Sequence, residues 1–175
     1  HLVKLLSVNV GTPQPISGKS GQSGIFKLPQ TGPVMIHPLG LENDAIVDTD
    51  NHGGLDQAVY IYCMPDYDWW SEQLGVELAP GTFGENLTLS ELESATVRVG
   101  DRFEIGEVLL EVTYPRIPCV TLARRMKDPL FVKKFHKAKR PGVYARVLRE
   151  GAVKAGMAVK HVLTDAEALL AVEMM

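Results

Sequence analysis

Hydrophobic residues in this chain fall into short runs that glycine and proline separate. Five runs are typical of β-strands, because β-branched and aromatic residues dominate them or alternate with polar residues. These predicted strands cover residues 3–10, 58–62, 107–113, 142–148 and 158–163. Closely spaced strands with few long helical patterns favour a barrel or curled sheet over alternating βαβ units. We therefore expect a mainly β fold, a β-barrel with a few short helices.

Helical patterns occur as inserts between these strands. Pro65 suits the first turn of a helix and Gly75 suits its end, so a helix is predicted over residues 65–74. Two more are predicted, one directly after Cys119 and one from Asp128-Pro129 to about Pro141. Thr164 and Glu167 have capping-box spacing, which predicts a short closing helix over residues 164–175.

Composition and charge narrow the class of protein. With 175 residues and 45% hydrophobic side chains, residues 1–175 are expected to form a single domain with a substantial core. A formal charge of -3 argues against binding along a nucleic-acid backbone. No apolar run approaches the ~20 residues of a membrane-spanning helix, and residues 1–10 lack a signal-peptide pattern. We expect a cytoplasmic protein with no nucleic-acid or membrane partner.

Familiar catalytic and metal-binding motifs do not match. Cys63 and Cys119 are far apart with no CxxC pair, which is typical of free thiols in a reducing compartment. Gly18-Lys-Ser20 resembles the end of a phosphate-binding loop, but Pro13 stands where that motif needs glycine. No Gly-x-Ser-x-Gly occurs, and the histidines are too scattered to predict a zinc site. Structural roles are expected for three of them, His37, His136 and His161.

Two segments hold polar residues that packing alone does not require. One runs from Gly40-Leu-Glu-Asn-Asp44 through Asp48 to His52-Gly-Gly54, directly before a predicted strand. The other is Pro80-Gly-Thr-Phe-Gly-Glu-Asn86, whose amide could donate to a ligand oxygen or cap its own loop. Glycine lets the backbone approach a ligand closely, but Asp48 and His52 could equally stabilise a turn. Each segment alone leaves both interpretations open.

A third segment, Tyr114-Pro-Arg-Ile-Pro-Cys119, carries the strongest chemical signal. If a helix begins directly after it, the N–H groups and positive dipole end would lower the pKa of Cys119. Arg116 and the Arg124-Arg125 pair would surround a thiolate with positive charge that also suits phosphate. The alternative is an inert buried cysteine, which we expect for Cys63 within an apolar strand. The sequence thus predicts chemistry centred on Cys119, at the edge of a pocket for an anionic cofactor.

Together these segments resemble the MOSC domain family, named after the C-terminal domain of molybdenum-cofactor sulfurases, and in particular its stand-alone members of the YiiM type. Seven short motifs carry the resemblance, in family order and across nearly the whole chain. They are Ser23-Gly-Ile-Phe-Lys27, Gly40-Leu-Glu-Asn-Asp44, Asp48 with His52-Gly-Gly54, Gly81-Thr-Phe-Gly-Glu-Asn-Leu87, Gly100-Asp101, Arg116-Ile-Pro-Cys119 and Gly142-Val-Tyr-Ala-Arg-Val-Leu148. Asn43 replaces the usual glycine before Asp44, and we expect it to be tolerated because asparagine also accepts a positive φ.

The resemblance implies a β-barrel that binds the molybdenum cofactor, a molybdopterin with its metal. It implies that Cys119 is the metal ligand and that Cys119 and His52 are catalytic. The residues that would bind the cofactor or brace its pocket are Lys27, Asp48, Asn86 and Arg116. The implied reaction is the reduction of N-hydroxylated small molecules such as hydroxylaminopurines, hydroxylamines and amidoximes. Electrons would come from a separate flavin or iron–sulfur protein.

Two other functions are compatible with the same residues. The chain could be a non-catalytic module that carries the cofactor or a sulfur atom, with Cys119 as a covalent handle. It could also be a barrel that binds another phosphorylated ligand through Lys27 and Arg116, with Cys119 inert. A persulfide on Cys119 without metal or turnover would favour the carrier, and slow alkylation of Cys119 at neutral pH would favour the barrel with an inert cysteine.

Overall fold

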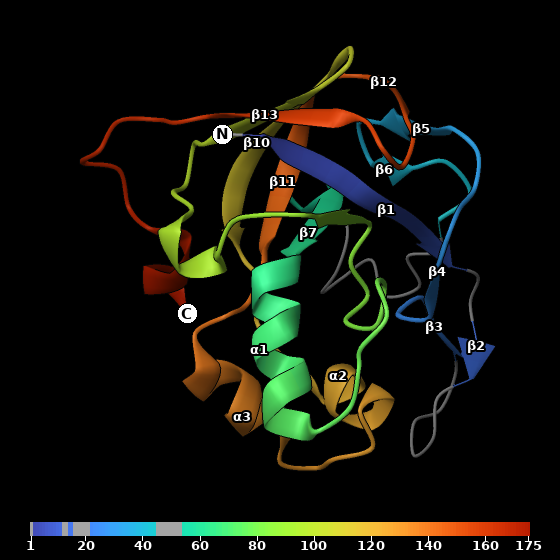
Figure 1. The fold of residues 1–175 in the computed structure, drawn as a ribbon, viewed down its shortest axis with the longest axis vertical. Helices are drawn as coiled ribbons and strands as arrows, with labels where there is room; N and C mark the ends of the chain where they lie inside the picture. The colour runs from blue at the N-terminus through green and yellow to red at the C-terminus, as the bar shows by residue number, and fades with distance from the viewer. Residues whose placement is uncertain (1, 12–13, 16–21, 45–53) are drawn as a thin grey trace.

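The core of the protein is a closed barrel of seven strands (Figure 1). We describe residues 2–11, 14–15, 22–44 and 54–175 of a computed structural model. Around the barrel, the strands run β13, β9, β10, β11, β7, β8 and β1, and β1 pairs with β13 to close it. Their bounds are β1 (Val3–Gly11), β7 (Val59–Cys63), β8 (Leu87–Leu89), β9 (Arg102–Ile105), β10 (Val108–Pro115), β11 (Val143–Arg149) and β13 (Ala158–Val162). Only β7 and β8 pair in parallel among these neighbours.

The hydrophobic pattern predicted this barrel correctly. All five predicted strands form barrel strands, each within two residues of its predicted bounds. The prediction missed β8 and β9, which have three and four residues and are too short to show a clear periodicity. Inward-facing side chains such as Leu5, Ile61 and Leu110 are fully buried and form the core of the barrel.

Short strands extend the barrel at its rim. A three-stranded sheet contains β12 (Gly151–Val153), β5 (Val34–His37) and β6 (Gly40–Leu41). Strand β4 (Lys27–Pro29) pairs with the end of β1, and β2 (Gln14–Pro15) pairs with β3 (Gln22–Ser23). This arrangement brings Lys27 against the barrel, opposite Gly11.

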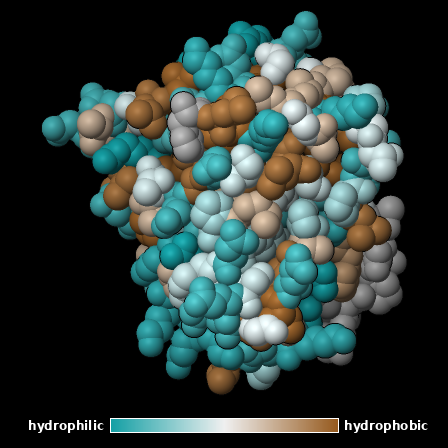
Figure 2. All heavy atoms as spheres, in the orientation of Figure 1, coloured by the Kyte–Doolittle hydropathy of each residue, from teal (hydrophilic) through white to brown (hydrophobic). Residues whose placement is uncertain are grey.

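In the described part of the chain, three α-helices lie at the end of the barrel opposite β12 and β13 (Figure 1). They are α1 (Met64–Leu74), α2 (Val120–Arg125) and α3 (Phe131–Ala138), as the proline and glycine positions predicted. Aromatic residues of α1 and α3 pack together in a second core, where Trp70 stacks on Phe135. Figure 2 shows hydrophobic residues gathered over the barrel strands and mostly hydrophilic residues over the helical end. None of the described helices is long and apolar enough to cross a bilayer.

The predicted closing helix is wrong. Residues 166–168 form a turn, Leu170 forms a β-bridge with Arg98, and only a single 3-10 turn, η3 (Ala171–Met174), follows. Here the N–H of Thr164 donates to the buried carboxylate of Asp101, and the N–H of Ala171 donates to the carbonyl of Val97. Tertiary hydrogen bonds to the barrel therefore take the donors that a helix would use, and they override the local capping signal. The other 3-10 turns are η1 (Leu55–Gln57) and η2 (Ser94–Thr96).

Candidate functional site

Cys119 stands at the first turn of α2, where the sequence predicted it. Its backbone is extended, with φ of -133° and ψ of 173°, and its carbonyl accepts from the N–H groups of Leu122 and Ala123. Its side chain is half-buried, whereas Cys63 is buried in β7. An electrostatic interaction joins Cys119 to Arg116 and Tyr144. Cys119 is therefore partly exposed as a residue and interacts electrostatically with a guanidinium.

Arg116 is buried beside Cys119, with 4% of its surface exposed. Its guanidinium carbon lies 5.1 Å from the centre of the Tyr60 ring and 5.8 Å from that of Phe135. Its Nη1 donates to the carbonyl of Phe83 at 2.5 Å. The Nε has no hydrogen-bond partner among the described residues. Two aromatic rings and a carbonyl thus hold the Arg116 guanidinium in place, and its Nε remains available as a hydrogen-bond donor.

A single carboxylate joins Lys27 to Asn86. Asp44 Oδ1 accepts from Lys27 Nζ at 2.7 Å, and Asp44 Oδ2 accepts from Asn86 Nδ2 at 2.7 Å. Asn86 Oδ1 in turn accepts from the N–H of Tyr60, which connects the network to the barrel. Lys27 and Asn86, predicted as cofactor-binding residues, are therefore part of a buried brace. Asn43 before Asp44 has a φ of 64°, as expected for the residue that replaces a glycine.

The glycines of the 80–86 loop allow it to pack against residues 25–27. Gly81 has a φ of +90°, and a Cβ there would lie 2.6 Å from the carbonyl oxygen of Lys27. Gly84 has a φ of +83°, and its Cβ would lie 2.9 Å from the Ile25 side chain. Any side chain at either position would separate the two segments. Close packing between segments therefore explains these glycines.

Glu85 lies at the base of the same loop and is fully buried. Its carboxylate accepts from the hydroxyls of Tyr67 at 2.6 Å and Thr88 at 2.9 Å, and from the N–H of Gly81. Burial raises the pKa of Glu85, and these hydrogen bonds partly oppose that shift. This carboxylate holds the loop in place and does not face solvent.

Arg125 connects α2 to the segment that carries Lys27. Its guanidinium carbon lies 5.2 Å from the centre of the Phe26 ring. Like that of Arg116, its buried Nε has no hydrogen-bond partner in the described part of the chain. Buried donors normally find a partner, so the unused guanidinium donors of Arg116 and Arg125 fit an anionic group.

The predicted site residues have different outcomes. Asp48 and His52 lie outside the described residues. Sequence reasoning named Arg125 as part of the positive charge around Cys119, but it did not single out Asp44 or Glu85 as site residues, although each lies in a motif that it identified. The available signal for Asp44 and Glu85 was the concentration of polar residues and glycines in both segments. Among the described residues, no three His, Cys, Asp or Glu side chains cluster closely enough to hold a metal ion.

Comparisons with known proteins agree on one family. Residues 48–160 match the profile of the MOSC domain. The Bacillus subtilis protein YflK is 40% identical over 154 residues, which cover 87% of this chain and 70% of YflK. A Gibberella moniliformis protein named as a reductase is 34% identical over 138 residues, 77% of this chain but only 24% of the fungal protein. The crystal structure of YiiM from Geobacillus stearothermophilus superposes with a TM-score of 0.80 at 30% identity, covering 98% of this chain and 81% of that one.

Proposed function

Because this chain belongs to the MOSC domain family, we propose that it binds the molybdenum cofactor and reduces N-hydroxylated compounds. Hydroxylaminopurines, hydroxylamines and amidoximes are the proposed substrates, and a separate flavin or iron–sulfur protein is the proposed electron donor. The similarity to YiiM and to a fungal protein named as a reductase supports this proposal.

Half-buried Cys119, with its electrostatic interaction with the buried Arg116 guanidinium, carries the proposal. A thiolate suits a soft metal, so Cys119 would hold the molybdenum. The free Nε donors of Arg116 and Arg125 would bind the anionic part of the pterin. Lys27 and Asn86 would brace the pocket wall through Asp44. Asp48 is also proposed as a residue that lines or braces the cofactor pocket.

The bound cofactor supplies the two-electron chemistry that reduces an N–OH group to N–H. The overall reaction consumes two electrons and two protons, breaks the N–O bond and releases water. His52 is proposed as the proton donor, because an imidazole changes its charge near neutral pH. The remaining task of the chain is to hold and orient the cofactor while leaving one face open to substrate.

The test is reconstitution in a host that makes the cofactor. Metal content would be measured by mass spectrometry, and turnover by reduction of benzamidoxime with reduced methyl viologen. Cys119→Ala should lose both, whereas Cys63→Ala, the matched control, should keep both because Cys63 lies in the barrel wall. Equal metal content in Cys119→Ala would reject the ligand assignment. A persulfide on Cys119 without metal or turnover would instead identify a sulfur carrier.

A further inference from the structure

Positive charge is concentrated in one part of this acidic protein. Residues 119–140 contain eight of the 18 lysines and arginines but only one of the 21 acidic residues. This segment, which forms α2 and α3, therefore has a formal charge of +7, and the rest of the chain has -10. Within the helical end, the surface formed by α2 and α3 is therefore basic, on a protein whose net charge is -3, whereas α1 beside them carries only acidic charges.

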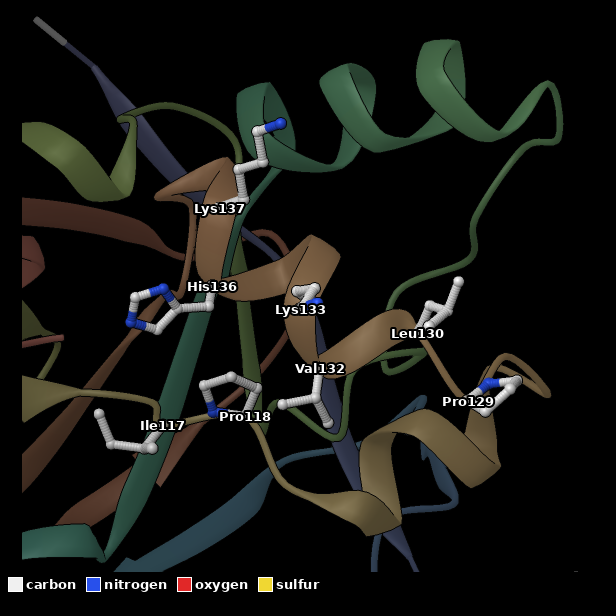
Figure 3. A pocket seen from close by; sticks show the side chains of 8 residues that line it. All are labelled: Ile117, Pro118, Pro129, Leu130, Val132, Lys133, His136 and Lys137. Carbon is white, nitrogen blue, oxygen red and sulfur yellow. The ribbon is translucent and has the colours of Figure 1, made fainter.

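A hollow with mostly apolar walls lies within this basic surface (Figure 3). Its volume is about 620 Å³, and its walls come from α3, from the residues before α3 and from the segment that leads into Cys119. The lining residues are Ile117, Pro118, Pro129, Leu130, Val132, Lys133, His136 and Lys137. Because Pro118 directly precedes Cys119, the hollow adjoins the candidate site.

Large apolar side chains are exposed at this hollow. Ile117 is 54% exposed and Leu130 is 60% exposed, and Val120, next to Cys119, is 54% exposed. Exposed apolar side chains that gather in one place mark surfaces for protein partners. The exposed apolar side chains that cluster here are therefore typical of the centre of a protein–protein interface.

Cationic side chains border the apolar residues. Lys134 forms an ion pair with Asp128 at 2.6 Å, and so its charge is largely balanced. Lys133 and Lys137 are exposed and form no ion pair with any described residue. An apolar centre with unbalanced lysines at its border is complementary to an acidic protein surface that carries a small apolar patch.

We propose that this surface, defined by Ile117, Leu130, Lys133 and Lys137, docks an acidic protein that delivers electrons to the site at Cys119. The choice of an electron donor rests on the function proposed above, which consumes two electrons in each turnover. A donor bound here would lie next to the segment that carries Cys119. Exposed isoleucine, leucine and proline favour a protein over a nucleic acid, whose backbone offers no apolar partner to them.

Binding to the cofactor-free protein tests the surface directly. The probes are two acidic redox proteins, a flavodoxin and a plant-type ferredoxin, titrated by calorimetry at low salt. Lys133→Glu/Lys137→Glu should weaken binding about tenfold or more, because each reversal turns an attraction into a repulsion. Ile117→Ala should weaken it through lost apolar contact. The charge-matched control is Lys4→Glu/Lys154→Glu, whose lysines are exposed in β1 and in the turn before β13, and it should stay within about twofold.

Several results would overturn the proposal. Equal loss of affinity in both double variants would show only a general charge effect, and no binding of either probe by the unmodified chain would exclude this class of partner. Tighter binding of a single-stranded oligonucleotide, or of vesicles rich in phosphatidylserine, would reject the choice of a protein.

Turnover measurements separate this proposal from the one on which it rests. In the loaded enzyme, Lys133→Glu/Lys137→Glu should raise the KM for flavodoxin and leave viologen-driven turnover unchanged. A chain that takes up no metal and shows no viologen-driven turnover refutes the proposed function. If the double variant still loses affinity for the acidic probes, docking of an acidic protein stands and only the electron-donor role is overturned.

Discussion

Lys27 and Asp44 form a buried ion pair in which Nζ lies 2.7 Å from Oδ1, with side-chain exposures of 8% and 4%. The other carboxylate oxygen accepts from Asn86, so this pair links β4, the turn after β6 and the loop before β8. Lys27 also donates to the carbonyl of Gly24 at 2.9 Å. The positive charge of Lys27 is therefore balanced within the protein, and its first role is structural.

Replacing Asp44 should destabilise the fold strongly. In Asp44→Ala, the Lys27 ammonium and the Asn86 amide lose their shared acceptor within a buried region, which is expected to cost about 3 kcal/mol of the free energy of unfolding. Urea denaturation followed by circular dichroism measures this change. Lys134→Ala removes an exposed ion pair instead and should leave the free energy of unfolding nearly unchanged. Similar stabilities of the two variants would contradict the bracing role.

The two cysteines should differ in reactivity. Iodoacetamide at neutral pH is expected to modify Cys119 about tenfold faster or more than Cys63 in the native protein. Burial raises the pKa of the Cys63 thiol, and the nearby carboxylates of Asp66 and Glu85 raise it further. Peptide mass spectrometry over a time course measures both rates. In the denatured chain both thiols should react alike, and faster modification of native Cys63 would contradict the placement of the two thiols.

Glu85 should make the protein less stable as the pH rises. Because burial raises its pKa above the ordinary value of 4.5, the folded protein holds this proton more tightly than the unfolded chain does. The resulting stabilisation is complete below pH 4.5 and is lost as the pH rises through the folded-state pKa. Glu85→Gln, which does not titrate, should flatten this part of the profile of unfolding free energy against pH. An unchanged profile in the variant would assign the pH dependence to another group.

Alanine at Gly81 should cost more than alanine at Gly75. Both residues have a positive φ, +90° and +70°, but only at Gly81 would the new Cβ meet another segment, the carbonyl of Lys27 at 2.6 Å. Gly75→Ala is expected to cost about 1 kcal/mol for its backbone conformation alone. Gly81→Ala should cost about 2–3 kcal/mol, because the clash adds to a similar conformational cost. Thermal denaturation of both variants measures the difference. Equal costs would show that the loop shifts away from the Lys27 carbonyl without destabilising the fold.

Local pattern was sufficient for much of the fold. Runs of β-branched and aromatic residues placed β1, β7, β10, β11 and β13, because a strand's periodicity is a property of the strand itself. Proline and glycine placed α1, α2 and α3 through their backbone preferences. The same reasoning failed at residues 164–175, where Thr164 and Ala171 bond to the barrel and not to a helix.

The sequence by itself determined five of the seven barrel strands, the helix that directly follows Cys119 and the presence of Arg116 three residues before Cys119. Only the tertiary structure decided that Asp44 joins Lys27 to Asn86 and that Arg125 reaches Phe26. Closure of the barrel brings these segments together, and each polar group then takes the partner that lies within reach. Local patterns describe single segments, so they carry no information on which distant carboxylate or ring a buried cation will meet.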